Sequence, residues 1–363
     1  MRSTRLYIDM EKIKANISEI KQYIPSNTEI MPIVKCNGYG THLNKFIEVI
    51  SQFKYIGVAL VDEGIILRES GYKGNIFVLY PPTKEELDDI QEHDLFFNGC
   101  DIEMLEYFNE KTDKSLTIHI EIETGMGRTG VSIKDVHSYT KRLKKLRNIK
   151  VDGVYSHLSS SSSDMEFSKQ QIDKFKDVLE IFDNESVSYN YVHIFNSGAI
   201  FNFKDPMFNM VRIGILIYGY FPNNRFKKLI NLYPSMVLKS KISFVKELDI
   251  GDTVGYNQNF IAKRKSVVAT IPFGFGDGFI GLEARELYNP YVIINGLKCK
   301  IIGICMDNMM IDVTDISNVK TGDEVIIFDN EQLTVEEVAE WCNGICNYEI
   351  ISSISDRIPR VFN

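Results

Sequence analysis

The chain has 363 residues, of which 44% are hydrophobic and 25% charged, and its net charge is −8. This length fits one large domain with a smaller one, and the composition is typical of a soluble globular protein. The acidic balance argues against nucleic-acid binding. No apolar run could span a bilayer and no signal peptide opens the chain. We expect a cytoplasmic protein, or the soluble cytoplasmic domain of a membrane-anchored one.

Up to about residue 220, short apolar runs alternate with amphipathic stretches. Two stretches, 43–52 and 62–70, have apolar residues at three-to-four spacing, which predicts helices. Ser163 or Asp164 can cap a third helix that continues to Phe182. Strands that alternate with helices predict a (β/α)8, TIM-like barrel. The eight predicted strands are 30–35, 55–60, 75–80, 94–99, 116–122, 151–157, 191–196 and 210–215.

After about residue 225 the pattern changes to short strands separated by turns such as Gly251-Asp252 and Asn295-Gly296. One helix is predicted at Leu333–Cys342. We therefore divide the chain into a barrel, residues 1–225, and a mostly β domain, residues 226–363, with the first few residues able to pair with the β domain. The strands predicted in the second domain are Met236–Leu248, Thr253–Tyr256, Ser266–Pro272, Pro290–Ile294, Leu297–Ile304 and Asp323–Asp329.

The six cysteines lack the paired spacing of a disulfide framework, and reduced thiols are the default in the cytoplasm. Cys342 and Cys346 are four residues apart, but no second pair of ligands accompanies them. We predict no metal site.

Lys35 is the most informative residue. It ends the apolar run Ile30–Lys35 and precedes a glycine-rich turn, Cys36–Gly40. In barrel enzymes the site is built at such strand ends. A lysine that is desolvated there has a lowered pKa and can act as a nucleophile or a base. The alternative is a lysine whose stem is buried and whose ammonium reaches solvent.

Other strand ends deliver further polar groups to the same mouth of the predicted barrel. The fifth strand leads to Arg128 through a glycine-rich loop, the sixth to His157, and the eighth carries Arg212. The turns after strands seven and eight are the usual phosphate site of such barrels. A lysine, two arginines and a phosphate site indicate a phosphorylated carbonyl cofactor held as a Schiff base, with pyridoxal 5′-phosphate (PLP) the first candidate.

Each of these residues has a simpler explanation. His157 can be a buried barrel histidine whose hydrogen bonds are satisfied, and Arg128 and Arg212 can pair with surface carboxylates. The loop with Gly125 and Gly127 can be an ordinary turn. Taken together at matching strand ends, the simpler explanations require several coincidences.

With these residues in place, the chain resembles the alanine racemase family of fold-type III PLP enzymes over essentially its whole length. The order and spacing of several short motifs carry the resemblance. They are Val34-Lys35-Cys36-Asn37-Gly38-Tyr39-Gly40, Thr124-Gly125-Met126-Gly127-Arg128, Phe195-Asn196-Ser197, Val211-Arg212-Ile213-Gly214, Val254-Gly255-Tyr256, Phe275-Gly276-Asp277-Gly278, Cys305-Met306-Asp307 and Arg357-Ile358-Pro359-Arg360.

The resemblance implies two catalytic bases on opposite faces of one Cα, as racemisation requires. Lys35 would hold the cofactor and be one base. Tyr256 would be the other, donated across a homodimer interface so that the two subunits share their active sites. A phenol is a weak acid, so Tyr256 would need a nearby cation to act as a base.

The resemblance also implies the remaining contacts. Arg128 would contact the cofactor phenolate and the substrate carboxylate. Arg212 would face the pyridine nitrogen, oriented by His157, and since arginine stays protonated the ring would be a weaker electron sink. Residues Tyr39, Asn196, Ser197, Gly214 and Ile215 would hold the cofactor phosphate, and Met306 and Asp356 would lie at the substrate.

The chain departs from the family pattern at positions that bear on specificity. Glu121 stands where many members carry a carbamylated lysine that anchors the arginine, and a carboxylate needs no CO2. Asp356 replaces a tyrosine that crowds the substrate, which favours a polar side chain such as that of serine. Here the chain resembles the serine-racemising relatives linked to vancomycin resistance. Gly281 and Gly303 replace two arginines at the entrance, which leaves room for a longer or basic side chain.

We therefore expect a PLP-dependent racemase of serine and alanine that works as a head-to-tail homodimer and supplies D-amino acids for peptidoglycan. A racemase of lysine or ornithine is the first alternative. A non-catalytic PLP-binding protein would resemble the barrel alone, and a decarboxylase would require an acidic group in place of Arg212.

Overall fold

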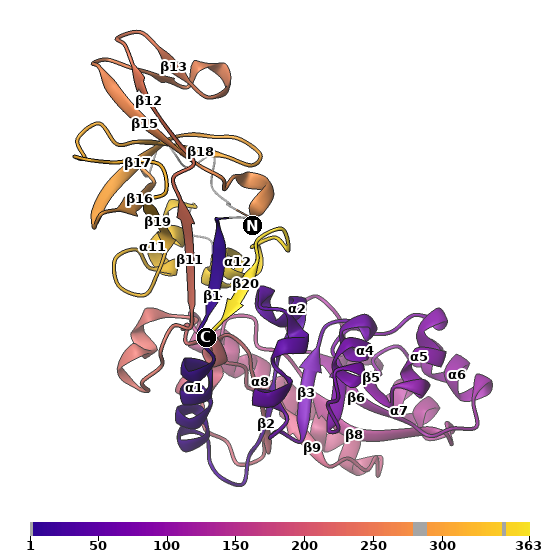
Figure 1. The fold of residues 1–363 in the computed structure, drawn as a ribbon. Helices are drawn as coiled ribbons and strands as arrows, with labels where there is room; N and C mark the ends of the chain where they lie inside the picture. Colours follow the sequence, from indigo (N-terminus) through magenta and orange to yellow (C-terminus); the bar gives the residue numbers. More distant parts are fainter. Residues whose placement is uncertain (1–2, 279–288, 343–345) are drawn as a thin grey trace. The chain divides into compact units, whose positions relative to one another are not determined.

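The computed structural model describes residues 3–278, 289–342 and 346–363. The chain forms two compact units. The barrel unit comprises residues 14–38 and 42–233, and the β unit comprises residues 1–13, 39–41 and 234–363. The β unit thus takes its strands from both ends of the chain (Figure 1).

The barrel unit contains the eight predicted strands, all parallel. Main-chain hydrogen bonds close the ring, because Val34 N–H donates to Gly57 O and Arg212 N–H donates to Phe195 O. Around the ring the strands are β2 (Glu29–Pro32), β3 (Tyr55–Val58), β4 (Asn75–Val78), β5 (Leu95–Asn98), β6 (Leu116–Glu123), β8 (Ile149–Tyr155), β9 (Tyr191–His193) and β10 (Met210–Ile213).

These strands read as apolar runs because the barrel buries both of their faces. The β3 strand is buried at all four positions. Polar side chains inside such runs therefore point to a special environment. His119, His193 and Arg212 are such residues, and each is 3% exposed or less.

Helices follow most of the strands (Figure 1). The predicted helices 62–70 and 164–182 are confirmed, and Asp164 caps the second by accepting the Phe167 N–H. The predicted helix 43–52 is wrong as one element, since it forms two single turns, η1 (Leu43–Lys45) and α3 (Ile47–Ile50). The two confirmed helices are α4 (Val61–Glu69) and α8 (Met165–Asn184). Further helices up to residue 233 are α1 (Met10–Tyr23), α5 (Leu87–Glu92), α6 (Ile102–Lys111), α7 (Val136–Leu143) and α9 (Ala199–Asn202).

The β unit is built on a nine-stranded sheet. Its order is β12-β15-β18-β17-β16-β19-β11-β1-β20. Strand β1 (Arg5–Ile8) pairs antiparallel with β11 and parallel with β20. The remaining strands are β11 (Met236–Lys241), β12 (Phe244–Leu248), β15 (Ser266–Ile271), β16 (Tyr291–Ile294), β17 (Leu297–Ile304), β18 (Met309–Asp312), β19 (Glu324–Phe328) and β20 (Arg360–Phe362).

Two predictions in the β unit are corrected, and some elements were not predicted. The run Met236–Leu248 is two strands, because the chain turns at Ile242 and Ser243 and pairs with different neighbours on either side. The run Thr253–Tyr256 ends as a strand at Val254, and Tyr256 opens a 3-10 turn, η6 (Tyr256–Gln258). Elements not predicted are β14 (Phe260–Ile261), β18, β20 and α12 (Asn347–Ser352).

The predicted helix 333–342 is present as α11 (Val335–Trp341), which Thr334 caps by accepting the Glu337 N–H. Among the described residues, no helix is long and apolar enough to cross a membrane.

Candidate active site

Lys35 lies directly after β2, in a turn of unusual handedness, α2 (Lys35–Gly40). All five residues from Cys36 to Gly40 have a positive φ, between 52° and 81°. For residues other than glycine this left-handed conformation costs roughly 1–2 kcal/mol each. Strain of this kind persists where the surrounding structure imposes it and is common at functional sites.

The barrel unit holds the first part of this turn through one carboxylate. Glu63 accepts the Asn37 N–H at 3.0 Å with one oxygen and the Ala59 N–H at 2.8 Å with the other. The Asn37 side chain in turn accepts the Leu43 N–H at 2.9 Å. The residue that carries the reactive amine is therefore fixed to the end of β3 and the start of α4.

The pKa of the Lys35 amine is lower than that of a free lysine. Burial lowers the pKa of Lys35, and the positive charges of Arg128 and Arg212 lower it further, against the opposing effects of Cys36 and Glu63. A neutral amine is the form that attacks a carbonyl or accepts a proton.

Arg212 is almost completely buried beneath the same mouth. Its Nη1 donates to His193 Nδ1 at 2.7 Å, and its Nη2 donates to Ser156 O at 2.8 Å and to His157 Nδ1 at 3.1 Å. Burial lowers the pKa of Arg212 to about 10, so the guanidinium remains charged at neutral pH. The simpler explanation of a surface ion pair is therefore wrong for Arg212.

The guanidinium keeps one donor for a ligand. The structure gives Nε–H of Arg212 no acceptor among the described residues, whereas both Nη groups are used by the protein. Nε–H is therefore the donor of Arg212 that is available to a ligand acceptor. His157 accepts from Arg212 through Nδ1, which leaves its own proton on Nε2. Burial, followed by the charge of Arg212, holds the pKa of His157 well below its ordinary value.

Arg128 lies within ion-pair distance of Glu121, the residue that stands in place of the carbamylated lysine. Arg128 Nη2 lies 3.6 Å from Glu121 Oε1, and Glu121 is 2% exposed. Asn98 Nδ2 donates to the same carboxylate at 2.7 Å, and Tyr155 Oη at 3.2 Å. Thr129 Oγ1 donates to it as well, so Asn98, Tyr155 and Thr129 fix the carboxylate behind the arginine.

The loop that presents Arg128 is shaped by its own carboxylate. Glu123 accepts the N–H groups of Gly125 and Gly127. Both glycines have a positive φ, 142° and 70°, which explains why glycine stands at these positions. The guanidinium of Arg128 lies 5.8 Å from the centre of the Tyr80 ring.

The turns after β9 and β10 meet at Ser197. The Ser197 hydroxyl accepts the Gly214 N–H at 3.0 Å, so its own proton is available to a ligand oxygen. Asn196 is used inside the turn, where its Oδ1 accepts the N–H groups of Gly198 and Ala199 at 3.1 Å. Ile215 follows as a fully buried residue.

In the β unit, Tyr256 stands on an exposed and strained turn. It is 71% exposed, and Asn257 and Gln258 after it have φ values of 55° and 54°. Most of the Tyr256 surface is therefore accessible in a single copy of the chain.

Three motifs of the β unit form one cluster. Phe275 N–H donates to Cys305 O at 3.1 Å, and Gly276 N–H donates to Met306 O at 2.8 Å. The main chain of Ser355 donates to Asp277 O at 3.1 Å. The motifs are 275–278, 305–307 and 353–360, and together they present Met306, which is 60% exposed.

Asp356 is 76% exposed, and its Oδ1 lies 3.9 Å from Nη1 of the buried Arg360. Arg360 Nε donates to Gly40 O at 2.8 Å, which ties the segment 39–41 to the β unit. Tyr39 in that segment lies with its ring centre 6.3 Å from that of Tyr348.

The two glycines predicted to widen the entrance have different outcomes. Gly281 lies outside the described residues. Gly303 lies in β17, where a Cβ would come within 2.6 Å of Met310 Cε and 3.3 Å of Val254 Cγ1. Within the β unit, the space beside residue 303 is therefore filled by Met310.

The sequence reasoning missed several residues that build the site. Glu63 holds the turn that follows Lys35. Asn98 and Tyr155 hold the carboxylate of Glu121, and His193 accepts a hydrogen bond from Arg212. The signal for Asn98 and His193 was a polar residue inside an otherwise apolar strand. Nothing local marked Glu63, which reads as an ordinary acidic residue in the first turn of a helix.

A closed parallel barrel with a desolvated lysine, a buried arginine with one unused donor and a following β unit define the class of enzymes that hold PLP on a lysine. The chain belongs to the alanine racemase family. Residues 8–222 match the model of the alanine racemase N-terminal domain, and residues 235–362 match that of the C-terminal domain.

Curated relatives match the chain over nearly its full length. Alanine racemase 2 of Caldanaerobacter subterraneus subsp. tengcongensis is 33% identical, with 100% of this chain and 95% of the relative covered. Alanine racemase of Methanococcus maripaludis is 34% identical, with 98% and 97% covered.

Solved structures agree. Alanine racemase of Clostridium difficile 630 superposes with a TM-score of 0.92 at 29% identity, with 100% of this chain and 96% of that one covered. The Bacillus anthracis alanine racemase with bound L-Ala-P also gives 0.92, at 30% identity, with 100% and 95% covered. The predicted fold is confirmed, and the enzyme is a PLP-dependent isomerase.

The lowered pKa of Lys35 predicts its reactivity toward acylating reagents. Because a lowered pKa populates the neutral amine at lower pH, acylation of Lys35 in the cofactor-free protein should reach half its maximum rate at a lower pH than acylation of Lys54. Lys54 is an internal reference, since its hydrogen bond to Tyr191 raises its pKa. Site-resolved mass spectrometry across a pH series measures both midpoints, and coincident midpoints would contradict the poised amine.

Proposed function

We propose that this protein racemises alanine, and serine as a second substrate, with PLP held on Lys35. The observation that carries the proposal is the pairing, within one barrel, of a desolvated lysine with a buried arginine whose Nε–H has no protein acceptor. Membership of the alanine racemase family supports the choice of alanine.

The residues present suit this cofactor. Lys35 supplies the amine, and Nε–H of Arg212 supplies a donor for the pyridine nitrogen. Ser197 and the turn at Gly214 and Ile215 supply groups for the phosphate, and Asn196 holds that turn in shape. Tyr39 remains a further candidate for the phosphate.

When bound, PLP supplies an electron-withdrawing ring that makes the Cα proton of an amino acid removable. Arg212 stays charged and donates a hydrogen bond without releasing its proton, so it moderates that withdrawal. Arg128, fixed by Glu121, offers a cation to the substrate carboxylate. The Lys35 amine takes or returns a proton on one face of Cα.

The second base is proposed to be Tyr256. Racemisation needs a proton donor on the face opposite the lysine. The high exposure of Tyr256 and the strained backbone after it support a role outside its own unit. We propose that a second copy of the chain receives this phenol, so that the active enzyme is a homodimer with shared sites.

Serine is included because of Asp356. Its carboxylate is exposed and can accept a hydrogen bond from a substrate hydroxyl. A substrate side chain that lacks a hydroxyl gains nothing from this acceptor. The products would be D-amino acids of the kind used in peptidoglycan.

Replacing the two proposed bases should separate their contributions. Lys35→Ala should remove the visible absorbance of the cofactor-bound protein, since no amine remains to hold the aldehyde. Tyr256→Phe should keep that absorbance and lower racemisation by roughly a hundredfold or more, in the range of general-base loss.

Absorbance spectra and optical rotation of L-alanine solutions measure these effects. Tyr233→Phe is the matched control, because Tyr233 is also exposed, at 47%. Full racemase activity in Tyr256→Phe would contradict the two-base proposal.

Asp356 should set the preference between alanine and serine. Asp356→Tyr should raise the alanine-to-serine ratio of kcat/KM roughly tenfold, the scale on which a pocket discriminates one small group. Turnover of L-alanine, L-serine and L-lysine by the unaltered enzyme provides the reference. An unchanged ratio would refute the role of Asp356, and fastest turnover of lysine would refute the choice of substrate.

Glu121 should make the enzyme independent of bicarbonate. Because the carboxylate that holds Arg128 belongs to the chain, activity in CO2-free buffer should equal activity with added bicarbonate. Glu121→Gln should lower kcat/KM roughly tenfold, as expected for loss of a supporting group, and bicarbonate should not restore it. Stimulation of the unaltered enzyme by bicarbonate would contradict this assignment.

A further inference from the structure

A chain of hydrogen bonds leads from Arg212 through the barrel interior to Asp152. Arg212 Nη1 lies 2.7 Å from His193 Nδ1, and His193 Nε2 lies 2.8 Å from His119 Nδ1. His119 Nε2 then lies 3.2 Å from Asp152 Oδ2. Both histidines are 0% exposed. The mechanism above uses only the first of these contacts.

The two ends of this chain fix its direction. A guanidinium can only donate, so His193 Nδ1 must accept, and the proton of His193 must sit on Nε2. It follows that His119 accepts through Nδ1 and donates through Nε2. The last acceptor is the Asp152 carboxylate, which cannot donate while ionised. One donor-only end and one acceptor-only end therefore select one tautomer for both histidines.

The charges agree with this assignment. Burial, followed by the charge of Arg212, holds the pKa of His193 well below its ordinary value, and burial lowers the pKa of His119 despite Asp152. Burial raises the pKa of Asp152, but hydrogen bonds from His119, Asn190 and Tyr55 outweigh this effect and leave it at about 2. Two neutral imidazoles thus join a cation to an anion.

Close packing restrains both rings from flipping, so a change of tautomer requires a proton shift. His193 stacks on Tyr155 with centres 4.9 Å apart and planes at 4°. His119 stacks on Phe77 at 4.6 Å, and its opposite side lies against Gly153, where a Cβ would be 2.4 Å from Nδ1. The absence of a side chain at Gly153 is what admits the His119 ring.

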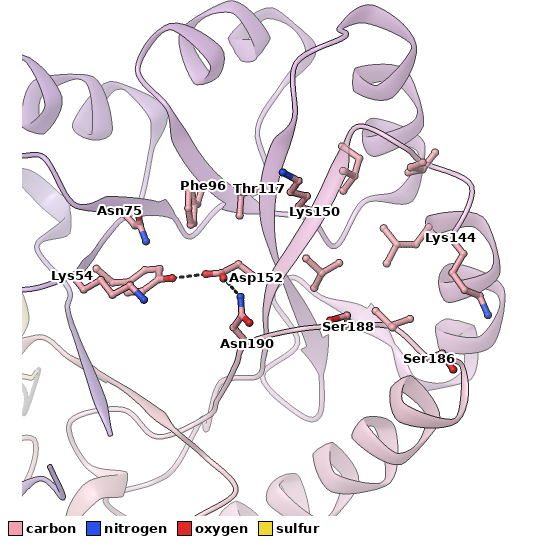
Figure 2. Close-up of a pocket in the computed structure, with 16 residues that line it drawn as sticks. Lys54, Asn75, Phe96, Thr117, Lys144, Lys150, Asp152, Ser186, Ser188 and Asn190 are labelled. Atoms are coloured by element: carbon pink, nitrogen blue, oxygen red, sulfur yellow. Dashed lines mark hydrogen bonds between the residues drawn. The ribbon is translucent and has the colours of Figure 1, made fainter. Parts of the chain in front are cut away.

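Asp152 lies where the chain of hydrogen bonds reaches solvent. Its side chain is 12% exposed and lines a pocket of about 600 Å³ near the amino-terminal ends of the barrel strands. The Tyr55 hydroxyl donates to Asp152 at 2.6 Å, and the Asn190 amide donates to it at 2.8 Å. Figure 2 shows Asn190 next to Asp152. Tyr55 and Asn190 orient the carboxylate toward His119.

We propose that Asp152 is a positioning residue for Arg212, and that it acts through His119 and His193 by fixing the tautomer that presents an acceptor to the guanidinium. Without an acceptor at position 152, the Nε2–H of His119 loses its partner, and only the guanidinium still opposes the opposite tautomers. In those tautomers His193 would present Nδ1–H to Nη1 of Arg212, and two donors would face each other. The guanidinium would lose a buried partner and its fixed orientation.

This inference rests on the proposed function, because the orientation of Arg212 matters to catalysis only if it faces the cofactor. Its first test therefore needs neither cofactor nor turnover. The chain has six histidines, so 15N-histidine labelling gives a small set of side-chain signals. In the cofactor-free protein, His119 and His193 should both show the neutral Nε2–H pattern, assigned by comparison with His119→Gln and His193→Gln.

Substitutions at Asp152 then test causation. Asp152→Leu should shift at least His119 away from the pure Nε2–H pattern, whereas Asp152→Asn retains an oxygen acceptor and should keep it. Asp183→Leu is the matched control, since Asp183 also accepts a tyrosine hydroxyl, from Tyr189 at 2.7 Å, but lies outside the chain of hydrogen bonds.

In the cofactor-loaded enzyme, Asp152→Leu should lower kcat for alanine roughly tenfold with KM changed less than about twofold, a loss typical of supporting groups. Asp152→Asn should recover most of this loss, and Asp183→Leu should match the unaltered enzyme.

An Nδ1–H or charged His193 in the unaltered protein would overturn the proposal, and this result does not depend on any variant folding. Unchanged tautomers in Asp152→Leu would overturn it as well. If the tautomers shift as expected but no racemase activity exists, the proposed function fails and the positioning of Arg212 by Asp152 stands.

Discussion

The burial of one guanidinium organises the barrel unit. Arg212 is 3% exposed, and its guanidinium stays positively charged. The groups around it must therefore accept its hydrogen bonds and carry no positive charge of their own. The carbonyls of Ser156 and His193 and the Nδ1 atoms of His157 and His193 meet this requirement. The same charge disfavours protonation of both imidazoles and of Lys35. Burial is the larger cause of these lowered pKa values, and the charge of Arg212 adds to it around a site for an anionic cofactor.

Most of the barrel could be predicted from the sequence because its strands are buried on both faces. Runs such as 75–80 and 116–122 are apolar, short and separated by amphipathic stretches, and the structure has a strand in each of the eight predicted runs. Active sites of such barrels lie at the carboxyl-terminal ends of the strands, which predicted that Lys35, His157 and Arg212 share one end of the barrel. These predictions depend on periodicity, which a single sequence carries.

The rest depends on contacts that periodicity does not encode. No propensity scale predicts a left-handed turn at Cys36 and Asn37, since Glu63 holds it from another helix. Tyr256 was assigned to a strand because Thr253 and Val254 favour one, but Gly255 has a φ of 79° and redirects the chain. His119 lay inside a predicted strand without a role, because its partners Asp152 and His193 come from two other strands.

Strand β1 has a consequence for how the protein is made. It is the first strand in the structure, yet both of its neighbours, β11 and β20, come after the whole barrel in the sequence. Main-chain bonds between Ile8 and Asn363 and between Met10 and Asn363 complete the parallel pair. During translation both edges of β1 stay unpaired until the barrel has been synthesised, because β11 and β20 follow the barrel in the sequence. The barrel strands pair with near neighbours in the sequence, whereas β1 pairs with strands far away in it, and contacts of such separation form slowly.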